Sequence, residues 1–229
     1  MKTFISILCG ILIVLLGIGI YVKTNQRRGL PAIHYQFHHI LISFHNYASR
    51  HDDALPQDIR SERGKPLLSW RVAILPFIEQ EELYNQFKLD ESWDSPHNRK
   101  LLPKMPRCYF LDFVKSAPGF THIQGFAGPG TLFDPTRKLP LTFNKVANAD
   151  GTSCTIYLAI AATPVPWTKP QDIEYSPNKP LPSLIGPSEN GFWVGLADGS
   201  TRWVSHEVSE TALRRAITWN DGKPLGDDW

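Results

Sequence analysis

The sequence is poor in cysteine, and its few cysteines follow no metal-binding or redox motif. Cys9, Cys108 and Cys154 are the only three in 229 residues, and no two of them form a CxxC pair. Structural zinc sites and dithiol redox centres depend on such pairs, so the sequence predicts neither. Cys108 and Cys154 can form one disulfide if the chain faces an oxidising compartment, and two separate buried thiols are the alternative.

An excess of charge of one sign is also missing. The chain carries 24 basic and 22 acidic residues, a formal net charge of +2, and no five-residue window is a basic cluster. Proteins that bind nucleic acid concentrate Lys and Arg on one face, so nucleic acid is excluded as a partner. Hydrophobic residues make up 42% and charged residues 20%, which is typical of a folded domain with a core.

Motifs for catalysis and phosphate binding are absent as well. The chain contains no GxSxG nucleophile elbow, no GxxxxGK[ST] phosphate loop and no GxGxxG fingerprint. The cysteines have no companion pattern of the kind that activates a nucleophile. We therefore expect a protein that is not an enzyme, with no catalytic residues, no cofactor and no bound metal.

Five histidines gathered in one short stretch make a metal site the alternative to consider. His34 and His38 are four residues apart and share a helix face, His45 is seven further on, and His39 and His51 complete the group. Imidazoles at such spacing can bind zinc or copper. No nearby carboxylate or thiolate completes a ligand set, so a polar helix flank is the favoured interpretation.

Acidic residues in two other places have simpler explanations than ligand binding. Asp90, Glu91 and Asp94 could offer oxygens to calcium, but the alternation and central glycine of an EF-hand loop are missing. Asp94 is better explained as a helix cap. Asp150 and Asp198 each precede a glycine and are interpreted as turn formers.

What the sequence does have is a long apolar run at its amino terminus. Residues Phe4–Val22 are nineteen positions without a charge, preceded by a short tail at 1–3 and followed by a basic junction at 23–32. At about 1.5 Å per residue, a helix of this length spans the hydrocarbon core of a bilayer. We interpret the run as a retained transmembrane anchor in contact with lipid, because a cleavable signal peptide has a shorter apolar core and a small-residue cleavage site.

Beyond the junction, apolar residues recur at helical spacing. The members of this stripe are Ile33, Phe37, Ile40, Leu41, Phe44 and Ala48. The pattern predicts an amphipathic helix whose apolar side needs a partner surface, and a sheet formed later in the chain is the expected partner. Pro76 then suits the first turn of a short helix, and a second is expected with Asp94 or Ser95 as cap, Pro96 at its first position and Pro103 at its end.

Proline and glycine, 19 and 16 residues respectively, indicate many turns in the rest of the chain. Tyr109–Asn148 is expected to form loops between short strands, and Pro164–Pro187, with seven prolines, an extended surface excursion. The apolar, β-branched run that starts at Ser153 predicts a buried strand. Asp198-Gly199 joins two apolar runs and accepts the positive φ angles of a tight hairpin, and Ser209 is expected to cap a final helix.

Aromatic residues offer one more alternative. Trp167, Trp193 and Trp203 could line an apolar groove for a partner. Packing in the core is the more common fate of tryptophan and is favoured here.

Several long strings carry a family resemblance. They are LSWRVAILPFIEQEELYNQFKLDESWDSPHNRKLL (Leu68–Leu102), DGTS (Asp150–Ser153), VPWTKPQDIEY (Val165–Tyr175) and GFWVGLADGSTRWV (Gly191–Val204). These strings resemble a large, uncharacterised family of pseudopilin-like exported proteins that is expanded in planctomycete bacteria. With the shorter strings that flank them, the resemblance covers about Ile33–Lys223.

The resemblance implies an α+β fold of the pilin kind. An amino-terminal helix begins in the membrane and continues into an amphipathic helix that rests on an antiparallel sheet, with short extra helices and long Pro/Gly-rich loops. We expect one pseudopilin-like domain over residues 33–223 and a tail at 224–229. The positive charges that flank the anchor slightly favour a cytoplasmic domain. Because the resemblance points to export, we expect a single-pass protein of the inner membrane with a periplasmic domain.

The sequence also departs from the family. Typical members have a glycine, then Phe-Thr-Leu and a glutamate just inside the apolar run, whereas here no glycine precedes Phe4 and the run contains no charge. We therefore expect neither prepilin processing nor polymerisation. The predicted function is that of a membrane-anchored structural or interaction protein with a protein partner in the envelope. The alternative is an exported module that binds a glycan, a peptide or a small solute.

Overall fold

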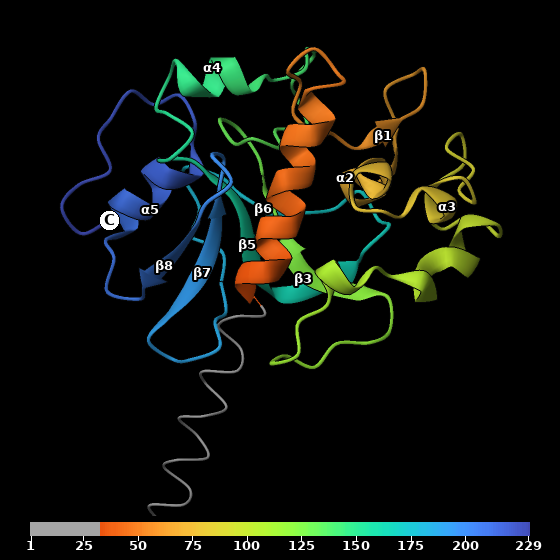
Figure 1. Cartoon of the computed structure of the whole chain (residues 1–229). Helices are drawn as coiled ribbons and strands as arrows, with labels where there is room; N and C mark the ends of the chain where they lie inside the picture. The colour runs from red at the N-terminus through yellow and green to blue at the C-terminus, as the bar shows by residue number, and fades with distance from the viewer. Residues whose placement is uncertain (1–32) are drawn as a thin grey trace, which may run out of the picture.

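A four-stranded antiparallel sheet forms the centre of the molecule (Figure 1). The structure is a computed structural model that describes residues 33–229. The strand order is β3-β5-β7-β8, and each neighbouring pair is antiparallel. These strands are β3 (Phe120–Gln124), β5 (Ile156–Pro166), β7 (Gly191–Leu196) and β8 (Thr201–Ser205). The predicted α+β class with an antiparallel sheet is confirmed.

One helix covers each face of this sheet. The helix over residues 33–48, called helix 33–48 from here on, packs on one face with its predicted apolar stripe fully buried. It approaches closely at Gly195 of β7, where an added Cβ would lie 2.9 Å from Leu41 Cδ1. On the other face, α5 (Glu210–Ile217) contributes Leu213, Ala216 and Ile217 to a second core.

β5 contributes side chains to both cores, and a bulge in this strand changes which side chains enter each core. Leu158 belongs to the core under helix 33–48 and Ala159 to the core under α5, which is the alternation of an ordinary strand. The register against β7 shifts between Ile156 and Leu158. As a result, Tyr157 and Leu158 both join the core under helix 33–48. The irregularity therefore adds a large aromatic ring to that core.

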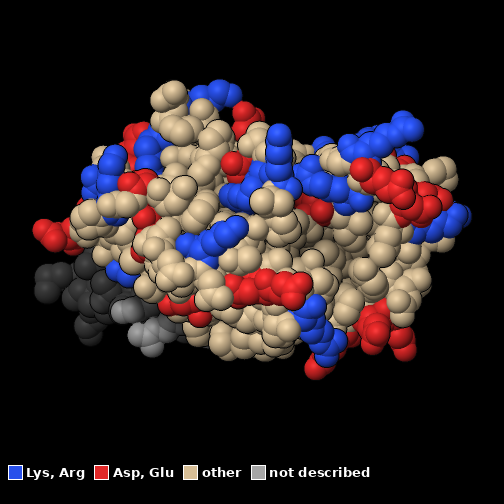
Figure 2. Space-filling model, turned by 90° about the horizontal axis from the view of Figure 1, so that it is seen from above, with Lys and Arg blue, Asp and Glu red and all other residues tan. Residues whose placement is uncertain are grey.

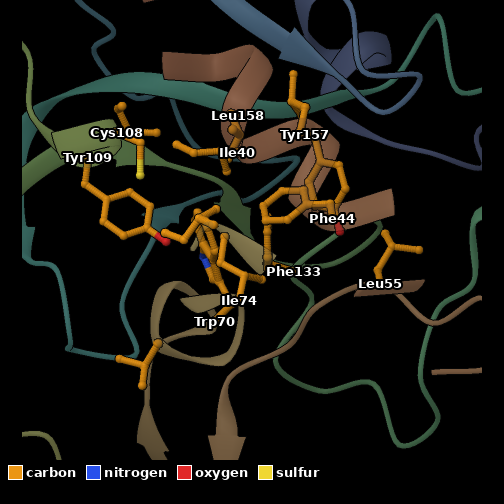
Figure 3. Packing of buried hydrophobic residues seen from close by; sticks show 14 of the residues in the cluster. Ile40, Phe44, Leu55, Trp70, Ile74, Cys108, Tyr109, Phe133, Tyr157 and Leu158 are labelled. Atoms are coloured by element: carbon orange, nitrogen blue, oxygen red, sulfur yellow. The ribbon is translucent and has the colours of Figure 1, made fainter. Parts of the chain in front are cut away.

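The larger core is aromatic, as Figure 3 shows. Phe44 of helix 33–48 lies 5.1 Å from Trp70 and 4.3 Å from Tyr157 of β5, measured between ring centroids. Trp70 in turn stacks on Phe133 at 5.5 Å. Such tilted and edge contacts are the favoured geometries of aromatic pairs. These rings tie the helix, the sheet and the loop regions into one core.

The predicted hairpin at the end of the sheet is confirmed, but its turn differs in detail. β7 pairs with β8 from Gly191↔Ser205 to Gly195↔Thr201. Only Gly199 has a positive φ, 90°, so the expected pair of positive angles over Asp198-Gly199 is wrong. The left-handed residue follows the turn instead of occupying its centre, because the Gly199 N–H donates to the Leu196 carbonyl at 3.1 Å.

The helix termini confirm one predicted cap and correct two boundaries. Ser209 Oγ accepts from the Ala212 N–H at 3.1 Å and caps α5 as expected. The helix that follows Pro76 is split in two by a left-handed Glu79, with φ 60°. The next one is a 3-10 helix that begins at Asn98 and contains Pro103. The short helices are α2 (Trp70–Ala73), η1 (Leu75–Phe77), α3 (Glu81–Tyr84), η2 (Asn98–Lys104), η3 (Arg107–Tyr109) and α4 (Phe143–Ala147).

The two Pro- and Gly-rich stretches hold more structure than expected. β3, an edge strand of the main sheet, and α4 both lie within Tyr109–Asn148. Within Pro164–Pro187, Trp167 is 0% and Tyr175 is 4% exposed and both belong to the core, whereas residues 177–180 are exposed as a surface excursion would be. Two small sheets complete the fold, β1 (Ile59–Arg60) with β2 (Pro66–Leu68), and β4 (Phe126–Ala127) with β6 (Ile173–Glu174).

The predicted anchor Phe4–Val22, its tail and its junction all lie outside the described residues. From residue 33 onward, no helix combines the length and the apolar character that crossing a bilayer requires. At the other end, Trp229 packs against the core under α5. Its backbone oxygen accepts from Arg202 Nη2 at 2.7 Å.

Candidate functional site

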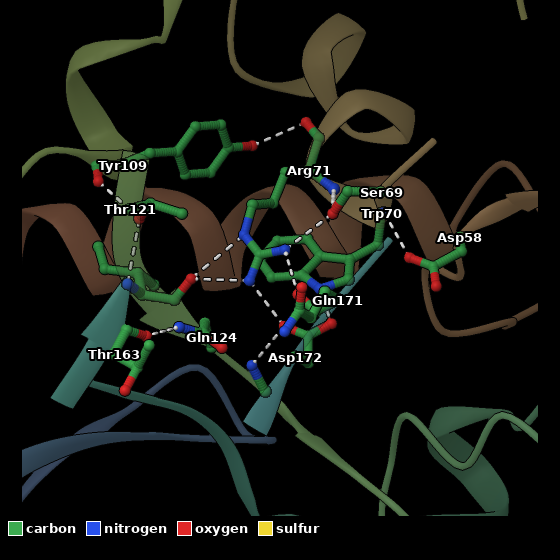
Figure 4. Close-up of polar contacts among 12 residues, drawn as sticks. Asp58, Ser69, Trp70, Arg71, Tyr109, Thr121, Gln124, Thr163, Gln171 and Asp172 are labelled. Atoms are coloured by element: carbon green, nitrogen blue, oxygen red, sulfur yellow. Dashed lines mark hydrogen bonds and ion pairs between the residues drawn. The ribbon is translucent and has the colours of Figure 1, made fainter. Parts of the chain in front are cut away.

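A buried ion pair lies between the main sheet and the short helices (Figure 4). Arg71 Nη2 lies 2.6 Å from Asp172 Oδ1, and the two side chains are 0% and 4% exposed. The guanidinium also donates from Nε and Nη2 to the Ile123 carbonyl, at 3.2 and 2.9 Å, and from Nη1 to Ser69 Oγ at 2.8 Å. A charge at this depth is tolerated only with such a full set of partners.

Asp172 connects segments that are far apart in the sequence. Its carboxylate accepts from Trp70 Nε1 and from the Gly125 N–H, both at 2.9 Å, in addition to Arg71. Burial raises the pKa of Asp172, while the guanidinium and these two donors oppose that rise. The pair thus joins α2, the end of β3 and the segment before β6. Because the ion pair is buried, we infer that it holds these segments together and does not bind a solute.

A second carboxylate, Asp58, lies beside this pair. Its Oδ1 accepts from the Trp70 backbone N–H at 3.0 Å. Burial and, secondarily, the nearby charge of Asp172 raise the pKa of Asp58 to about 6. Asp58 therefore takes up a proton in mildly acidic solution, well above the range usual for an aspartate.

A cavity of about 290 Å³ lies beside the amino-terminal half of helix 33–48. Its volume is close to the lower limit of small-molecule sites, about 300 Å³. Three parts of the chain line it, namely helix 33–48, the segment after η1 and the start of η3. The lining residues are Tyr35, Gln36, His39, Ile78, Glu79, Gln80, Pro106, Arg107 and Cys108.

Gln36 gives this cavity a buried polar wall. The side chain is on the core side of helix 33–48 and the residue is only 4% exposed. Its Nε2 donates to the Phe110 carbonyl, whereas its Oε1 has no hydrogen-bond partner in the described part of the chain. A buried carbonyl oxygen without a donor costs about 1–3 kcal/mol.

Glu79 gives the cavity a carboxylate on an unfavourable backbone. Its φ of 60° is left-handed, and the following Gln80 N–H donates back to the Leu75 carbonyl at 3.0 Å. Glycine is the usual residue where a helix ends in this way, and any other residue costs about 1–2 kcal/mol. Glu79 is exposed and forms no ion pair with any residue from 33 to 229.

Two other polar residues of the cavity, Arg107 and Cys108, are engaged or neutral. Arg107 Nη2 donates to both carboxylate oxygens of Asp112, at 2.8 and 2.7 Å, and the guanidinium lies over the Phe110 ring. Burial raises the pKa of Cys108 to about 12, so its thiol stays protonated and is a poor nucleophile at neutral pH. Cys108 and Cys154 are both free, so the disulfide considered from the sequence is not formed.

Of the histidines considered as metal ligands, His34 and His38 stack with ring centroids 6.1 Å apart, and the others have different neighbours. His34 Nδ1 is hydrogen-bonded to Thr201 Oγ1 of β8. His45 stacks on the ring of Phe143, the first residue of α4, with ring centroids 4.3 Å apart. Burial lowers the pKa of His45. His51 stacks on Tyr47 at 3.8 Å. Across residues 33–229, no three potential ligands from His, Cys, Asp and Glu come together.

The acidic residues considered as ligands contact other parts of the chain, most of them nearby in the sequence. Glu91 pairs with Lys88 at 2.9 Å, and Asp94 accepts from a neighbouring serine hydroxyl at 2.6 Å. Asp150 accepts from two backbone N–H groups near the carboxyl end, both at 2.8 Å. Asp198 accepts from the Ser200 N–H in the hairpin turn, which confirms its predicted role.

The three tryptophans do not share a groove. Trp167 is fully buried, and its Nε1 donates to the Leu102 carbonyl at 2.9 Å. Trp193 and Trp203 face each other across β7 and β8, with ring centroids 5.6 Å apart. Trp167 is therefore a core residue, and the other two form a cross-strand pair.

Charges of both signs are mixed on the surface. Figure 2 shows Lys and Arg side chains lying among Asp and Glu side chains over the face seen from above. Exposed pairs such as Lys179–Glu174, 3.0 Å apart, join opposite charges directly. This face therefore presents no strong field of one sign.

Sequence reasoning missed the residues that organise this region. Arg71 is the only charge in the apolar run Leu67–Leu75, which is a signal of a buried cation. Its partner Asp172 is 101 residues away and cannot be found from local pattern. Gln36 and Glu79 gave no signal, because one is an ordinary helix residue and the other precedes further glutamates.

Part of the chain matches a known protein family. Residues 34–122 match the model of a family described as "Protein of unknown function (DUF1559)". This segment is less than half of the chain, and it includes every cavity residue and Arg71. No curated protein and no solved structure matches the chain. Over residues 34–122 the protein is therefore similar to an uncharacterised domain family.

Proposed function

We propose that the protein is a non-enzymatic, pseudopilin-like module of the bacterial envelope, of the kind expanded in planctomycetes. Phe4–Val22 anchors it in the inner membrane by a single pass, and its domain lies outside the cytoplasm. There it binds a protein partner through the outer face of helix 33–48. Two observations support this proposal, one from the sequence and one from the surface of the helix.

The order of the segments supports the anchored, pilin-like layout. An uncharged run of nineteen residues is followed by a junction of ten residues and then by helix 33–48. That helix packs on an antiparallel sheet, as the family resemblance implies. A domain tied this closely to a spanning segment stays near the membrane surface.

The outer face of helix 33–48 carries the proposal of a protein partner. Residues 33–49 contain no Lys, Arg, Asp or Glu, although one side of the helix faces solvent. Tyr35 is 66% and Ile42 is 42% exposed on that side. Surface helices normally carry charges there, whereas protein interfaces are poor in charge and rich in aromatic residues. The face has the composition of an interface.

Site-specific crosslinking in native membranes tests this function. A photo-crosslinking residue replaces Ile42 in the full-length chain, and the matched control carries it at Leu139, which is 72% exposed and lies outside helix 33–48. We expect the chain in the membrane fraction and a protein adduct of defined mass from position 42 alone. Equal adducts from both positions, or none from either, would contradict the proposal.

A second candidate function is the binding of a small ligand by an exported module. The specific observation that favours it is the cavity of about 290 Å³ beside helix 33–48. The cavity and the outer face of helix 33–48 share Tyr35.

A further inference from the structure

The outer face of helix 33–48 brings two exposed histidines together. The rings of His34 and His38 stack with their centroids 6.1 Å apart and an angle of 19° between their planes. One turn of helix separates the two residues, so the backbone holds both side chains on the same side. Their spacing alone favours a polar helix flank. The structure adds that the two rings are neighbours and that both are open to solvent.

A hydrogen bond from another element positions the ring of His34. Its Nδ1 is hydrogen-bonded to Thr201 Oγ1 at the start of β8. A threonine hydroxyl can accept as well as donate, so it can accept from Nδ1–H while Nε2 keeps a free lone pair. Histidines that bind metals commonly donate from their second ring nitrogen to an oxygen atom in this way. The Nε2 atom of His34 is therefore suited to a metal ion.

Helix 33–48 carries no positive charge that would repel a metal cation. Residues 33–49 contain no Lys and no Arg. On the neighbouring strand, Arg202 follows Thr201, and successive side chains of a strand point to opposite faces of the sheet. Arg202 Nη2 donates to the backbone oxygen of Trp229, which packs in the core under α5. This guanidinium thus lies on the side of the sheet away from the histidines.

The separation of the two rings is close to what one metal ion requires. Zinc–nitrogen distances are about 2.0–2.1 Å, so two imidazoles on one tetrahedral ion have centroids about 5 Å apart. The observed 6.1 Å exceeds this by about 1 Å, which rotation about the side-chain torsions of exposed residues can close. Within residues 33–229 no group of three potential ligands forms, so water fills the remaining positions of the ion.

We propose that His34 and His38 bind one divalent transition-metal ion of the zinc and copper class. Imidazole suits these metals, whereas magnesium and calcium prefer oxygen ligands. The ion connects successive turns at the start of helix 33–48, and Thr201 is a positioning residue for one ligand. Metal binding by the purified chain requires neither the anchor nor a protein partner. Its failure therefore leaves the proposed function intact, and the reverse also holds.

Titration calorimetry tests metal binding on the full-length chain, purified in detergent without a histidine tag. Zn²⁺ is the titrant, and Mg²⁺ is the control ion because it prefers oxygen ligands. We expect one Zn²⁺ to bind per chain and Mg²⁺ to give no heat of binding. Absence of Zn²⁺ binding at millimolar concentration would overturn the proposal.

Single substitutions locate the site. His34→Gln and His38→Gln each remove one exposed ligand, and we expect the dissociation constant for Zn²⁺ to rise at least tenfold. The reason is that a second ligand held beside the first acts at a high effective concentration. His51→Gln is the matched control, since His51 is exposed but lies beyond the helix, and it should bind as the wild type does. Wild-type affinity in a folded His34→Gln or His38→Gln chain, checked by circular dichroism, would refute the assignment.

Two substitutions of Thr201 test its positioning role. Thr201→Val keeps the shape of the side chain but removes the hydroxyl, and we expect the affinity for Zn²⁺ to fall at least threefold. Thr201→Ser keeps the hydroxyl and should retain the affinity of the wild type. If the valine variant binds Zn²⁺ as tightly as the serine variant, the positioning role is wrong.

Discussion

Asp58 is the residue whose surroundings most clearly oppose its own charge. Its folded pKa is about 6, against about 4 in an unfolded chain. The folded state therefore binds this proton more tightly, and the stability it contributes is present below about pH 4 and is lost as the pH rises through about 6. At neutral pH the ionised carboxylate costs roughly 3 kcal/mol, counted from about two pKa units.

Asp58→Asn should remove that cost and keep the acceptor for the Trp70 N–H. We expect the variant to exceed the wild type in unfolding free energy by about 1–3 kcal/mol at pH 8 and by much less at pH 4. Urea denaturation at the two pH values measures this. Asp90→Asn, at an exposed carboxylate, is the control. A gain of equal size at both pH values would show that the charge of Asp58 is not the cause.

At this scale the sequence indicates a residue's chemistry better than its partner. Arg71 is visible as a lone charge among apolar neighbours, but the tie to Asp172 depends on how β3 and the segment before β6 meet. Glu79 differs from the glutamates after it only by its backbone angle, which follows from the end of η1. Both facts arise from tertiary contacts.

At the scale of elements, α5 depends on a single side-chain cap. Ser209→Ala removes the hydrogen bond to the Ala212 N–H and should cost about 1 kcal/mol of stability. Because α5 covers one face of the sheet, the loss should appear in global unfolding, measured by thermal or urea denaturation. Ser209→Asn, another good cap, should restore most of it. A variant with Ala as stable as the one with Asn would show that the cap is dispensable.

The elements predicted correctly are those with a strong local signal. Helix 33–48 has a regular apolar stripe, β5 a β-branched run, and the hairpin and α5 have a turn dipeptide and a cap. β3 has none of these features, and α4 has only a cap, Thr142, ahead of a five-residue helix. β3 becomes a strand because β5 offers it an edge, and Pro103 is accommodated because a 3-10 helix lacks the regular α-helical bonding that proline breaks.

At the scale of the whole molecule, the proposed anchor gives a prediction about topology. Our proposal predicts that protease added to intact spheroplasts digests residues 33–229 and leaves a small membrane-bound fragment. The measured mass of the undigested chain should correspond to a sequence that begins at Met1, since no prepilin cleavage is expected. A cytoplasmic reporter protein is the control for leakage. Digestion only after lysis would reverse the topology, and recovery as a free soluble chain would exclude the anchor.

The stretch that sequence comparison recognises cannot be an independent folding unit. Residues 34–122 contain nearly all of helix 33–48 but only the first three residues of β3, and β5, β7 and β8 come later in the chain. In a chain cut after residue 122, the apolar stripe of helix 33–48 would be exposed to water. Arg71 would also lack its counter-ion, Asp172. Recombination or domain shuffling could therefore transmit this stretch only together with the carboxy-terminal half.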